Sequence, residues 1–434
     1  MLVDFSVRNF RSFEDESLFS MNVESGRNRL RSNFQEVSDG KLAVLKSAAI
    51  LGPNASGKSN LLRAIRALKW IICESHRLPE GASLPTYEPF RLSEKSSASP
   101  VEFEIEFIVP SGMRYRYSIG FLRNRVTHET LHSFPGRQKA LIFERGPEDT
   151  WEDVKFGGTY KGGSRRIPFF KSNSYLSKAG NDASAPESVR EISNYFRTIF
   201  SVSAGTKLRV ANYFEQDGHL EAVSDIICLA DTGVESVTAE ARSEGSDLRL
   251  PEDMPEDLKE AIIQENSRSY KFWLRSKSGG LIEFEEDEMS DGTIKLFEIL
   301  PILLNAISCG APVLIDELDG HLHTNLVGLV LELFHDPLLN TRGSQIIFTT
   351  HDTNVMNSTK LRRDQIWMTS KAQGSSTLFS LDEYDKKLVR QDSPFEAFYL
   401  DGRFGALPSL SYSKIRDRLS KIVEREGYFK DVVE

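Results

Sequence analysis

The chain has 434 residues, of which 39% are apolar and 27% are charged, and its formal net charge is −9. This composition is typical of a globular chain with roughly two or three folding units, and it excludes a mainly disordered or collagen-like chain. The negative total argues against a generally basic nucleic-acid binder, but not against a local basic surface.

The N-terminus and the cysteines indicate a cytoplasmic protein. The first residues, Met1 to Asp4, lack the basic and apolar segments of a secretory signal. No apolar run approaches the length of about 18 residues that a membrane span needs. Cys73, Cys228 and Cys309 lie far apart, which favours neither a disulfide framework nor a zinc site. We therefore expect a cytoplasmic protein with no membrane partner.

The first part of the chain combines strands with one helix. Apolar and polar residues alternate over residues 3–7, which predicts a strand. A buried strand at 48–51 runs into the glycine-rich residues 52–59, and apolar residues then recur with a helical period over 60–75. Over 101–156 the period changes to two, which predicts an antiparallel meander with one face in solvent.

The middle of the chain is less regular. Residues 188–199 and 220–230 show helical spacing, and Gly233 follows the second as a stop signal. Residues 270–284 predict a hairpin.

The last third alternates strands with helices. A helical stretch at 294–307, bent or broken at Pro301, precedes a buried strand at 312–315. Helical spacing resumes through residues 326–333, and a second buried strand follows at 345–349. This alternation predicts a mainly parallel sheet at the centre of an α/β fold.

The glycine-rich loop fits the Gly-x4-Gly-Lys-Ser pattern of a phosphate-binding P-loop. Its glycines allow backbone N–H groups to turn toward phosphates at the start of a helix. Lys58 would neutralise the β- and γ-phosphates, and the Ser59 hydroxyl would ligate Mg²⁺. The expected nucleotide-binding residues are Gly52, Pro53, Asn54, Ala55, Ser56, Gly57, Lys58, Ser59 and Asn60.

Two carboxylates follow the strand at 312–315. Asp316 would help to hold Mg²⁺, and Glu317 would orient or deprotonate the attacking water. The alternative is that both residues merely cap the next helix, which adjacent acidic residues often do.

Two further motifs could reach a phosphate. Ser290, Asp291, Gly292 and Thr293 stand at a helix start, where a hydroxyl and backbone amides can bind an anion, although an ordinary N-cap also explains them. His351 directly follows a buried strand and could reach the γ-phosphate or the attacking water. A structural histidine is the alternative.

In this order the motifs resemble one family closely. They resemble the head of an ABC-type ATPase, the class shared with chromosome-maintenance and double-strand-break-repair ATPases. More narrowly, the chain resembles the small prokaryotic AAA-like ABC ATPases of anti-phage defence loci. Residues 9–13 (Asn-Phe-Arg-Ser-Phe), residues 316–319 (Asp-Glu-Leu-Asp) with His323, and residues 399–406 carry the narrower match.

The resemblance implies a fold and a division of the chain. The fold would be a P-loop ABC-type ATPase head with a mainly parallel central sheet, an antiparallel β meander and a mostly helical insertion. We expect an N-terminal ATPase lobe at 1–156, an inserted region at 157–275, where the resemblance is weak, and a C-terminal lobe at 276–434.

The resemblance also assigns roles by motif. Residues 52–59 would be Walker A, Asp316 the end of Walker B, Glu317 the catalytic base, Asp319 the D-loop acid and His351 the switch histidine. In this family two heads sandwich two ATP molecules, each between one head's P-loop and the other head's signature.

Three positions concern the details of that site. The signature in trans would be Ser290, Asp291, Gly292 and Thr293, with Asp291 where a neutral residue is common. Arg11 would be an additional contact to phosphate or base. No glutamine marks residues 86–91, so the magnesium contact of the Q-loop is unassigned.

Two functions follow from the resemblance, each with ATP and Mg²⁺. In the first, an ATPase that forms a homodimer or higher homo-oligomer controls a nuclease-like or toxin effector in anti-phage defence. In the second, a DNA-repair or DNA-end-binding ATPase acts on nucleic acid directly.

Weaker patterns have simpler explanations. A basic strand face could bind nucleic acid, although charged residues on the wet face of a meander are commoner. Its residues would be Arg114, Arg116, Arg123, Arg125, Arg165, Arg166 and Lys171. His321 and His323 could suggest a metal site, but positions i and i+2 do not face each other on a helix.

Overall fold

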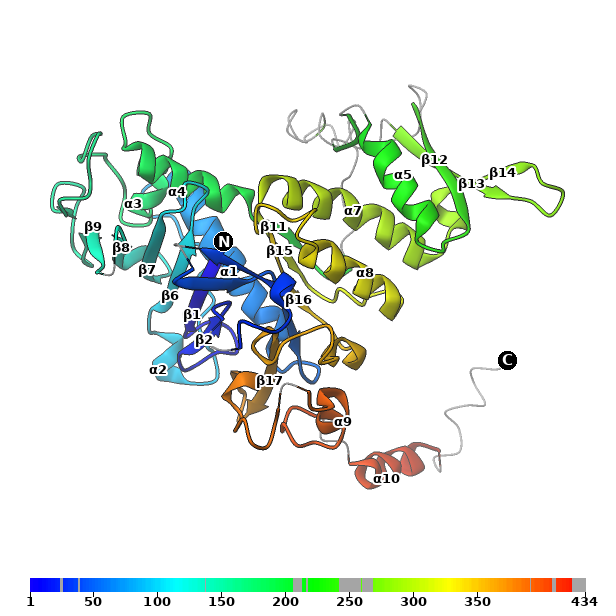
Figure 1. Cartoon of the computed structure of the whole chain (residues 1–434). Coiled ribbons are helices and arrows are strands. Elements are labelled where there is room, and N and C mark those ends of the chain that lie inside the picture. Colours follow the sequence, from blue (N-terminus) through cyan, green and yellow to red (C-terminus); the bar gives the residue numbers. More distant parts are fainter. Residues whose placement is uncertain are drawn as a thin grey trace.

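Two large sheets organise the chain, one mainly parallel and one antiparallel (Figure 1). Helix α1 (Lys58–Glu74) packs in the core that joins them. The computed structural model describes residues 1–23, 26–37, 40–136, 138–205, 213–215, 218–241, 259, 268–390, 392–407 and 411–423.

The central sheet has the strand order β11-β15-β16-β5-β17-β18. Every neighbouring pair is parallel except β17 with β18, so the predicted mainly parallel sheet is confirmed. Its strands are β5 (Ser47–Leu51), β11 (Phe200–Val202), β15 (Pro312–Ile315), β16 (Gln345–Thr349), β17 (Ile366–Ala372) and β18 (Ser375–Ser380).

Both faces of the central sheet are buried, which explains why its strands are continuously apolar. In β5, Ala48 and Ile50 join the core around α1, whereas Ala49 and Leu51 face the opposite core. Helices α7 (Asp291–Cys309) and α8 (Thr324–His335) supply that second core. The sheet is therefore the middle layer between two cores.

The second large sheet is wholly antiparallel, with the order β10-β9-β8-β7-β6-β1-β2. It confirms the predicted meander and adds two N-terminal strands to its edge. Its strands are β1 (Leu2–Arg8), β2 (Ser17–Ser20), β6 (Val101–Ile108), β7 (Arg114–Leu122), β8 (Arg125–Ser133), β9 (Ala140–Arg145) and β10 (Lys155–Phe156).

A buried ion pair fastens this sheet to the next helix. Glu129 is fully buried, and its carboxylate accepts hydrogen bonds from Tyr117 Oη and Ser174 Oγ, both at 2.9 Å. It also accepts from two backbone N–H groups at the start of α3 (Tyr175–Gly180). Arg145 lies 3.6 Å away, and burial lowers its pKa. These donors stabilise a charge that burial alone would penalise.

The described part of residues 157–275 contains helices and strands. Strand β11 forms an edge of the central sheet, and β12 pairs with β13 in a sheet that β14 completes. The predicted helices at 188–199 and 220–230 correspond to α4 and α5, and the predicted hairpin is β13–β14. These elements are α4 (Glu187–Thr198), α5 (His219–Leu229), β12 (Val234–Ala241), β13 (Arg268–Arg275) and β14 (Leu281–Phe284).

Smaller elements complete the described chain. They are β3 (Phe34–Val37), β4 (Leu42–Leu45), α2 (Glu94–Ser97), α9 (Phe395–Leu400) and α10 (Tyr412–Val423). Strands β3 and β4 pair with each other.

Helix α7 continues through Pro301 and is not broken there. It is long and apolar enough to cross a membrane by length and composition alone, but over half of it is buried inside the protein. Leu296, Ile299, Leu300 and Leu303 are fully buried in the core beside the central sheet. Packing on both sides of Pro301 keeps the helix continuous, and α7 is a core helix.

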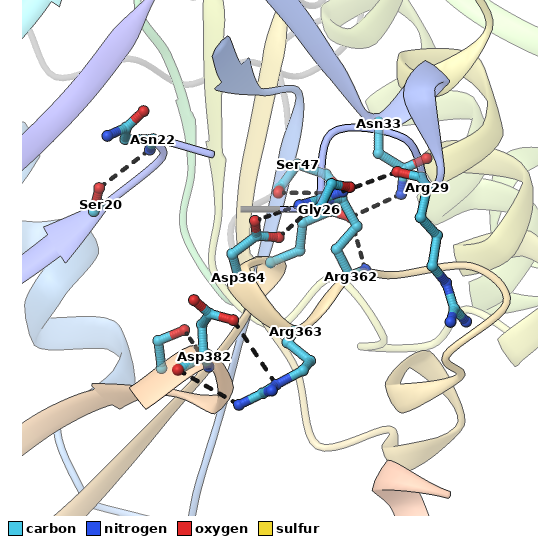
Figure 2. A network of polar contacts seen from close by, with 12 residues as sticks. Ser20, Asn22, Gly26, Arg29, Asn33, Ser47, Arg362, Arg363, Asp364 and Asp382 are labelled. Carbon is cyan, nitrogen blue, oxygen red and sulfur yellow. Dashed lines mark hydrogen bonds and ion pairs between the residues drawn. The ribbon is translucent and has the colours of Figure 1, made fainter. Parts of the chain in front are cut away.

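Two buried arginines fix the connections near β17 (Figure 2). Arg362 donates two hydrogen bonds to the carboxylate of Asp364, at 2.8 and 2.9 Å, and two more to the carbonyls of Gly26 and Arg29. Arg363 donates to backbone carbonyls that follow β18. Bidentate pairing of this kind holds a planar geometry as well as a charge. Segments distant in sequence are thereby fixed to the start of β17.

A buried histidine lies behind the P-loop strand. His335 Nε2 is 2.8 Å from the hydroxyl of Ser47, which also accepts from Gln365 Nε2 at 2.6 Å. Asn33 in turn donates to the Gln365 side chain at 2.7 Å. Burial, with a smaller contribution from the charge of Lys46, lowers the pKa of His335 to about 3. His335 is therefore neutral in the fold.

This pKa makes stability depend on pH. Unfolded histidine titrates near 6.5, so between about pH 6.5 and 3 the unfolded chain binds one more proton than the folded chain. The free energy of unfolding should therefore fall as the pH drops through that window. In His335→Gln, the slope between pH 5.5 and 4.5 should be smaller by about 1.4 kcal/mol per pH unit, measured by urea unfolding. The exposed His351→Gln is the control, and equal slopes for His335→Gln and the unmodified chain would contradict the prediction.

Candidate P-loop ATPase site

The glycine-rich loop joins β5 to α1, as the sequence predicts. Gly52 and Gly57 have φ values of 144° and 118°, which side-chain-bearing residues rarely adopt. Space is also restricted: a Cβ on Gly52 would lie 2.5 Å from the carbonyl oxygen of Thr369, and one on Gly57 would lie 2.5 Å from Ser376 Oγ. The loop therefore requires glycine at both ends.

The residues between the two glycines form the tip of the loop. Asn54 and Ala55 are exposed, and Pro53 is half-buried. The hydroxyl of Ser56 is hydrogen-bonded to that of Thr369 on β17, which holds the loop from behind.

Lys58 places its ammonium group at this loop. Its Nζ donates to the carbonyl oxygens of Gly52 at 2.8 Å and Pro53 at 3.1 Å. Burial lowers the pKa of Lys58, and the nearby carboxylates of Glu317 and Asp316 partly oppose that shift. A partly desolvated cation beside inward-turning N–H groups is suited to phosphate.

Asp316 is the centre of the site. It directly follows β15, and its Oδ1 accepts hydrogen bonds from Ser59 Oγ at 2.8 Å and from Thr349 Oγ1 at 2.7 Å. A hydroxyl and a carboxylate are the hard oxygen ligands that Mg²⁺ prefers, so Ser59 and Asp316 fit that cation. Thr349, the last residue of β16, was missed by the sequence reasoning, although its position at the end of a buried strand was a usable signal.

Glu317 follows with an unusual backbone. Its φ is 57°, and its N–H donates to Thr349 Oγ1 at 2.7 Å. Its side chain is exposed at the carboxyl ends of the strands. Positive φ at a residue other than glycine is uncommon and clusters at functional sites.

The helix-capping alternative for Asp316 and Glu317 is wrong. Helix α8 begins at Thr324, and its N-cap is His323, whose Nδ1 accepts from the N–H of Asn325 at 3.2 Å. His323 is thus a helix cap, which accounts for it without a metal.

Asp319 and His351 lie next to each other. The N–H of His351 donates to Asp319 Oδ2 at 3.0 Å, so the carboxylate fixes the backbone that carries the exposed histidine ring. Within the described chain, Asp319 Oδ1 is buried and has no hydrogen-bond partner. The two predicted residues therefore form one unit.

Arg11 lies beside the start of α1. Its Nη1 donates to Asn60 Oδ1 at 3.2 Å, and Asn60 Nδ2 donates to Ser12 Oγ at 2.7 Å. Arg11 also pairs with the carboxylate of Glu88. Glu88 lies within residues 86–91, where no Q-loop glutamine was found, and the sequence reasoning did not single it out.

Ser290 is the N-cap of α7, and its hydroxyl accepts from the N–H of Thr293 at 3.2 Å. The motif packs against a neighbouring turn: a Cβ on Gly292 would lie 2.7 Å from the carbonyl of His321, and Asp291 lies 3.4 Å from the His321 ring. Capping is therefore one role of Ser290, and its role toward nucleotide stays a prediction. Among the described residues, these hydrogen bonds do not connect the motif to its own P-loop.

Part of the basic strand face is paired with glutamates. Arg114 and Arg116 pair with Glu106 at 3.1 and 2.7 Å, and Lys171 pairs with Glu148 at 3.0 Å. This pairing favours the interpretation of these residues as the solvent-exposed face of a meander over their interpretation as a nucleic-acid surface.

The chain was compared with known protein families and with curated proteins. Residues 47–357, which include the glycine-rich loop, residues 290–293, Asp316 and His351, match the family described as "AAA domain, putative AbiEii toxin, Type IV TA system". No curated protein matches.

Solved structures were compared as well. The SMC head domain from Thermotoga maritima is 16% identical, with 87% of this chain and 98% of that chain covered and a TM-score of 0.38. An Smc head domain bound to the C-terminal domain of ScpA, derived from Pyrococcus furiosus, is 14% identical, with 87% of this chain and 96% of that chain covered and a TM-score of 0.38. The recombination mediator protein RecF-ATPrS in the RecFOR pathway is 12% identical, with 87% of this chain and 98% of that chain covered and a TM-score of 0.33.

Thr349 should position the carboxylates without touching substrate. Thr349→Val removes the acceptor for the Glu317 N–H and one donor to Asp316, so the turnover of ATP should fall about tenfold while the affinity for ATP changes little. Thr349→Ser keeps the hydroxyl and should restore most turnover. Steady-state hydrolysis and equilibrium ATP binding would measure both, and a loss in binding equal to that in turnover would contradict a positioning role.

Proposed function

Because this chain belongs to the family described as "AAA domain, putative AbiEii toxin, Type IV TA system", we propose that it is a cytoplasmic ABC-type ATPase that hydrolyses ATP to ADP and phosphate. The observation that carries the proposal is the junction at Asp316. There Ser59 of α1, Asp316 directly after β15 and Thr349 of β16 meet by hydrogen bonds of 2.8 and 2.7 Å, directly beside Glu317.

Each residue has a distinct task. Lys58 and the loop amides bind the phosphates, with Arg11 and Asn60 beside them. Mg²⁺, held by Ser59 and Asp316, would offset phosphate charge and polarise the γ-phosphate. Glu317 accepts a proton from the attacking water, and its exposed carboxylate is free to reach that water. His351, whose N–H donates to Asp319, would sense the γ-phosphate.

Completion of the site requires a second chain. The motif of Ser290, Asp291, Gly292 and Thr293 offers amides and hydroxyls at the positive end of a helix of 19 residues. Because that motif bonds to its own surroundings and not to its own P-loop among the described residues, we assign it to the P-loop of a second copy. ATP would then join two heads as a homodimer, or within a higher homo-oligomer.

The biological output we propose is control of a partner effector, nuclease-like or toxin, in anti-phage defence. The family description supports this direction, because it names a putative toxin and a toxin–antitoxin system. Direct action on DNA has less support, because Arg114, Arg116 and Lys171 of its candidate basic face are paired with glutamates.

Lys58 and Glu317 should fail in different ways. Lys58→Ala removes a phosphate partner, so its affinity for ATP should fall about tenfold or more. Glu317→Gln keeps shape but cannot accept a proton, so binding should persist while turnover falls by about 10²-fold or more. Light scattering with ATP should then show a dimer for Glu317→Gln and a monomer for Lys58→Ala. Equal loss of ATP binding in both variants would contradict these roles.

Sharing of sites predicts complementation. Ser290→Arg places a bulky cation in the signature and leaves the P-loop of the same chain intact, whereas Lys58→Ala does the reverse. Each variant alone should be inactive. An equimolar mixture should recover roughly a quarter of the unmodified activity, because half of the dimers are mixed and each has one intact site of two.

The Ser290→Arg variant needs a folding control, since losing the N-cap of α7 costs about 1 kcal/mol. Thermal unfolding of Ser290→Arg and of Ser290→Ala should show that both remain folded. Substantial hydrolysis by monomeric Ser290→Arg would contradict the model, because the site would then lie within one chain.

A further inference from the structure

We propose that helix α10 of one chain docks on the acidic hairpin of a second copy and clamps the ATP-bound dimer. The acidic hairpin is defined here as residues 281–288, comprising β14 and the turn before Ser290. The inference rests on the proposed head dimer and adds to it a surface that no sequence motif indicated.

Helix α10 has an apolar stripe that nothing in its own chain covers among the described residues. Tyr412, Ile415, Leu419 and Ile422 recur at helical spacing, and 48 to 76% of each residue is exposed. Figure 1 shows the helix standing apart from the body beyond α9. A short amphipathic helix gains most of its stability by burying such a stripe, so this one requires an occupant.

The polar side of α10 is basic. Lys414, Arg416 and Arg418 are exposed, and Asp417 lies 3.7 Å from Arg416. In a heptad that places Tyr412 and Leu419 at position a, Arg416 and Arg418 occupy the flanking positions e and g. If two copies of α10 paired with each other, these arginines would face one another and their like charges would repel. The charge pattern therefore disfavours self-pairing and favours an acidic, partly apolar surface.

The acidic hairpin has those two properties. Leu281 and Ile282 are 50 and 51% exposed. They are followed by five carboxylates, two of which, Glu283 and Glu285, pair with the ammonium group of Lys271. The carboxylates are Glu283, Glu285, Glu286, Asp287 and Glu288.

The proposed dimer would bring the two surfaces together. The hairpin immediately precedes Ser290, so a signature that approaches a partner's P-loop carries the hairpin with it. Strand β18 lies against that P-loop, because the Ser376 side chain closely approaches Gly57, and the chain then continues into α9 and α10. Within one chain, Figure 1 shows α10 at the bottom and the β13–β14 hairpin at the upper right, well apart from each other. The contact is therefore assigned between copies.

Charge reversal tests the clamp in a Glu317→Gln background with ATP. One variant carries Lys414→Glu, Arg416→Glu and Arg418→Glu, and the other carries Glu286→Lys, Asp287→Lys and Glu288→Lys. Each should raise the dissociation constant of the dimer at least about tenfold, measured by analytical ultracentrifugation, because like charges would face each other. The matched control reverses three exposed lysines of the antiparallel lobe, Lys139→Glu, Lys155→Glu and Lys161→Glu, and should leave the constant unchanged.

Mixing the two reversed variants separates a contact between chains from one within a chain. In a mixed dimer each acidic α10 meets a basic hairpin and each basic α10 an acidic hairpin, so the dissociation constant should return to within about threefold of the parent. Failure of the mixture to recover, or reversal variants that dimerise like the parent, would overturn the clamp and leave the ATPase dimer intact. A Glu317→Gln parent that stays monomeric with ATP would overturn the dimer and the clamp together.

Discussion

One carboxylate oxygen, Asp316 Oδ1, holds the site together. It accepts hydrogen bonds from Ser59 and Thr349, which lie 257 and 33 residues away in the chain. Ser59 lies in the first turn of the helix after β5, Asp316 directly follows strand β15, and Thr349 is the last residue of strand β16. The parallel pairing of the three strands brings them to the same edge, because parallel strands end on one side of a sheet. The positions of Ser59, Asp316 and Glu317 relative to one another all depend on that register.

The supporting framework relies on buried polar groups that are individually satisfied. Glu129 receives four hydrogen-bond donors, Arg362 uses its guanidinium on one carboxylate and two carbonyls, and His335 is neutral beside Ser47. Such groups are costly to bury and specific once satisfied. They fix connections whose apolar packing alone would tolerate a shift, and the site at the sheet edge therefore rests on a rigid base.

Sequence reasoning predicted the α/β class, the mainly parallel sheet, the meander and the loop from 52 to 59, because each leaves a local signature of period, glycine or apolar run. It missed Thr349 and Glu88, whose importance comes from partners far away in the chain. It also left open whether Asp316 and Glu317 cap a helix, a question that the position of His323 decides. Strand β11 was not predicted, since three residues in an irregular region carry too little pattern to indicate a sheet edge. Motifs that are local in the sequence could be predicted from it, whereas contacts between residues far apart in the chain could not.

The close contact between the P-loop and the strands behind it limits how this protein can change over evolutionary time. Ser376 touches the space where Gly57 would carry a Cβ, and Thr369 does the same for Gly52. A larger side chain at 376 would press on the loop as surely as a side chain at 57, although 376 belongs to no nucleotide-binding motif. Positions 369 and 376 should therefore accept few residue types and vary together with the loop in related chains. The constraint on the loop therefore extends beyond its eight residues to Thr369 and Ser376, which lie more than 300 positions further along the chain.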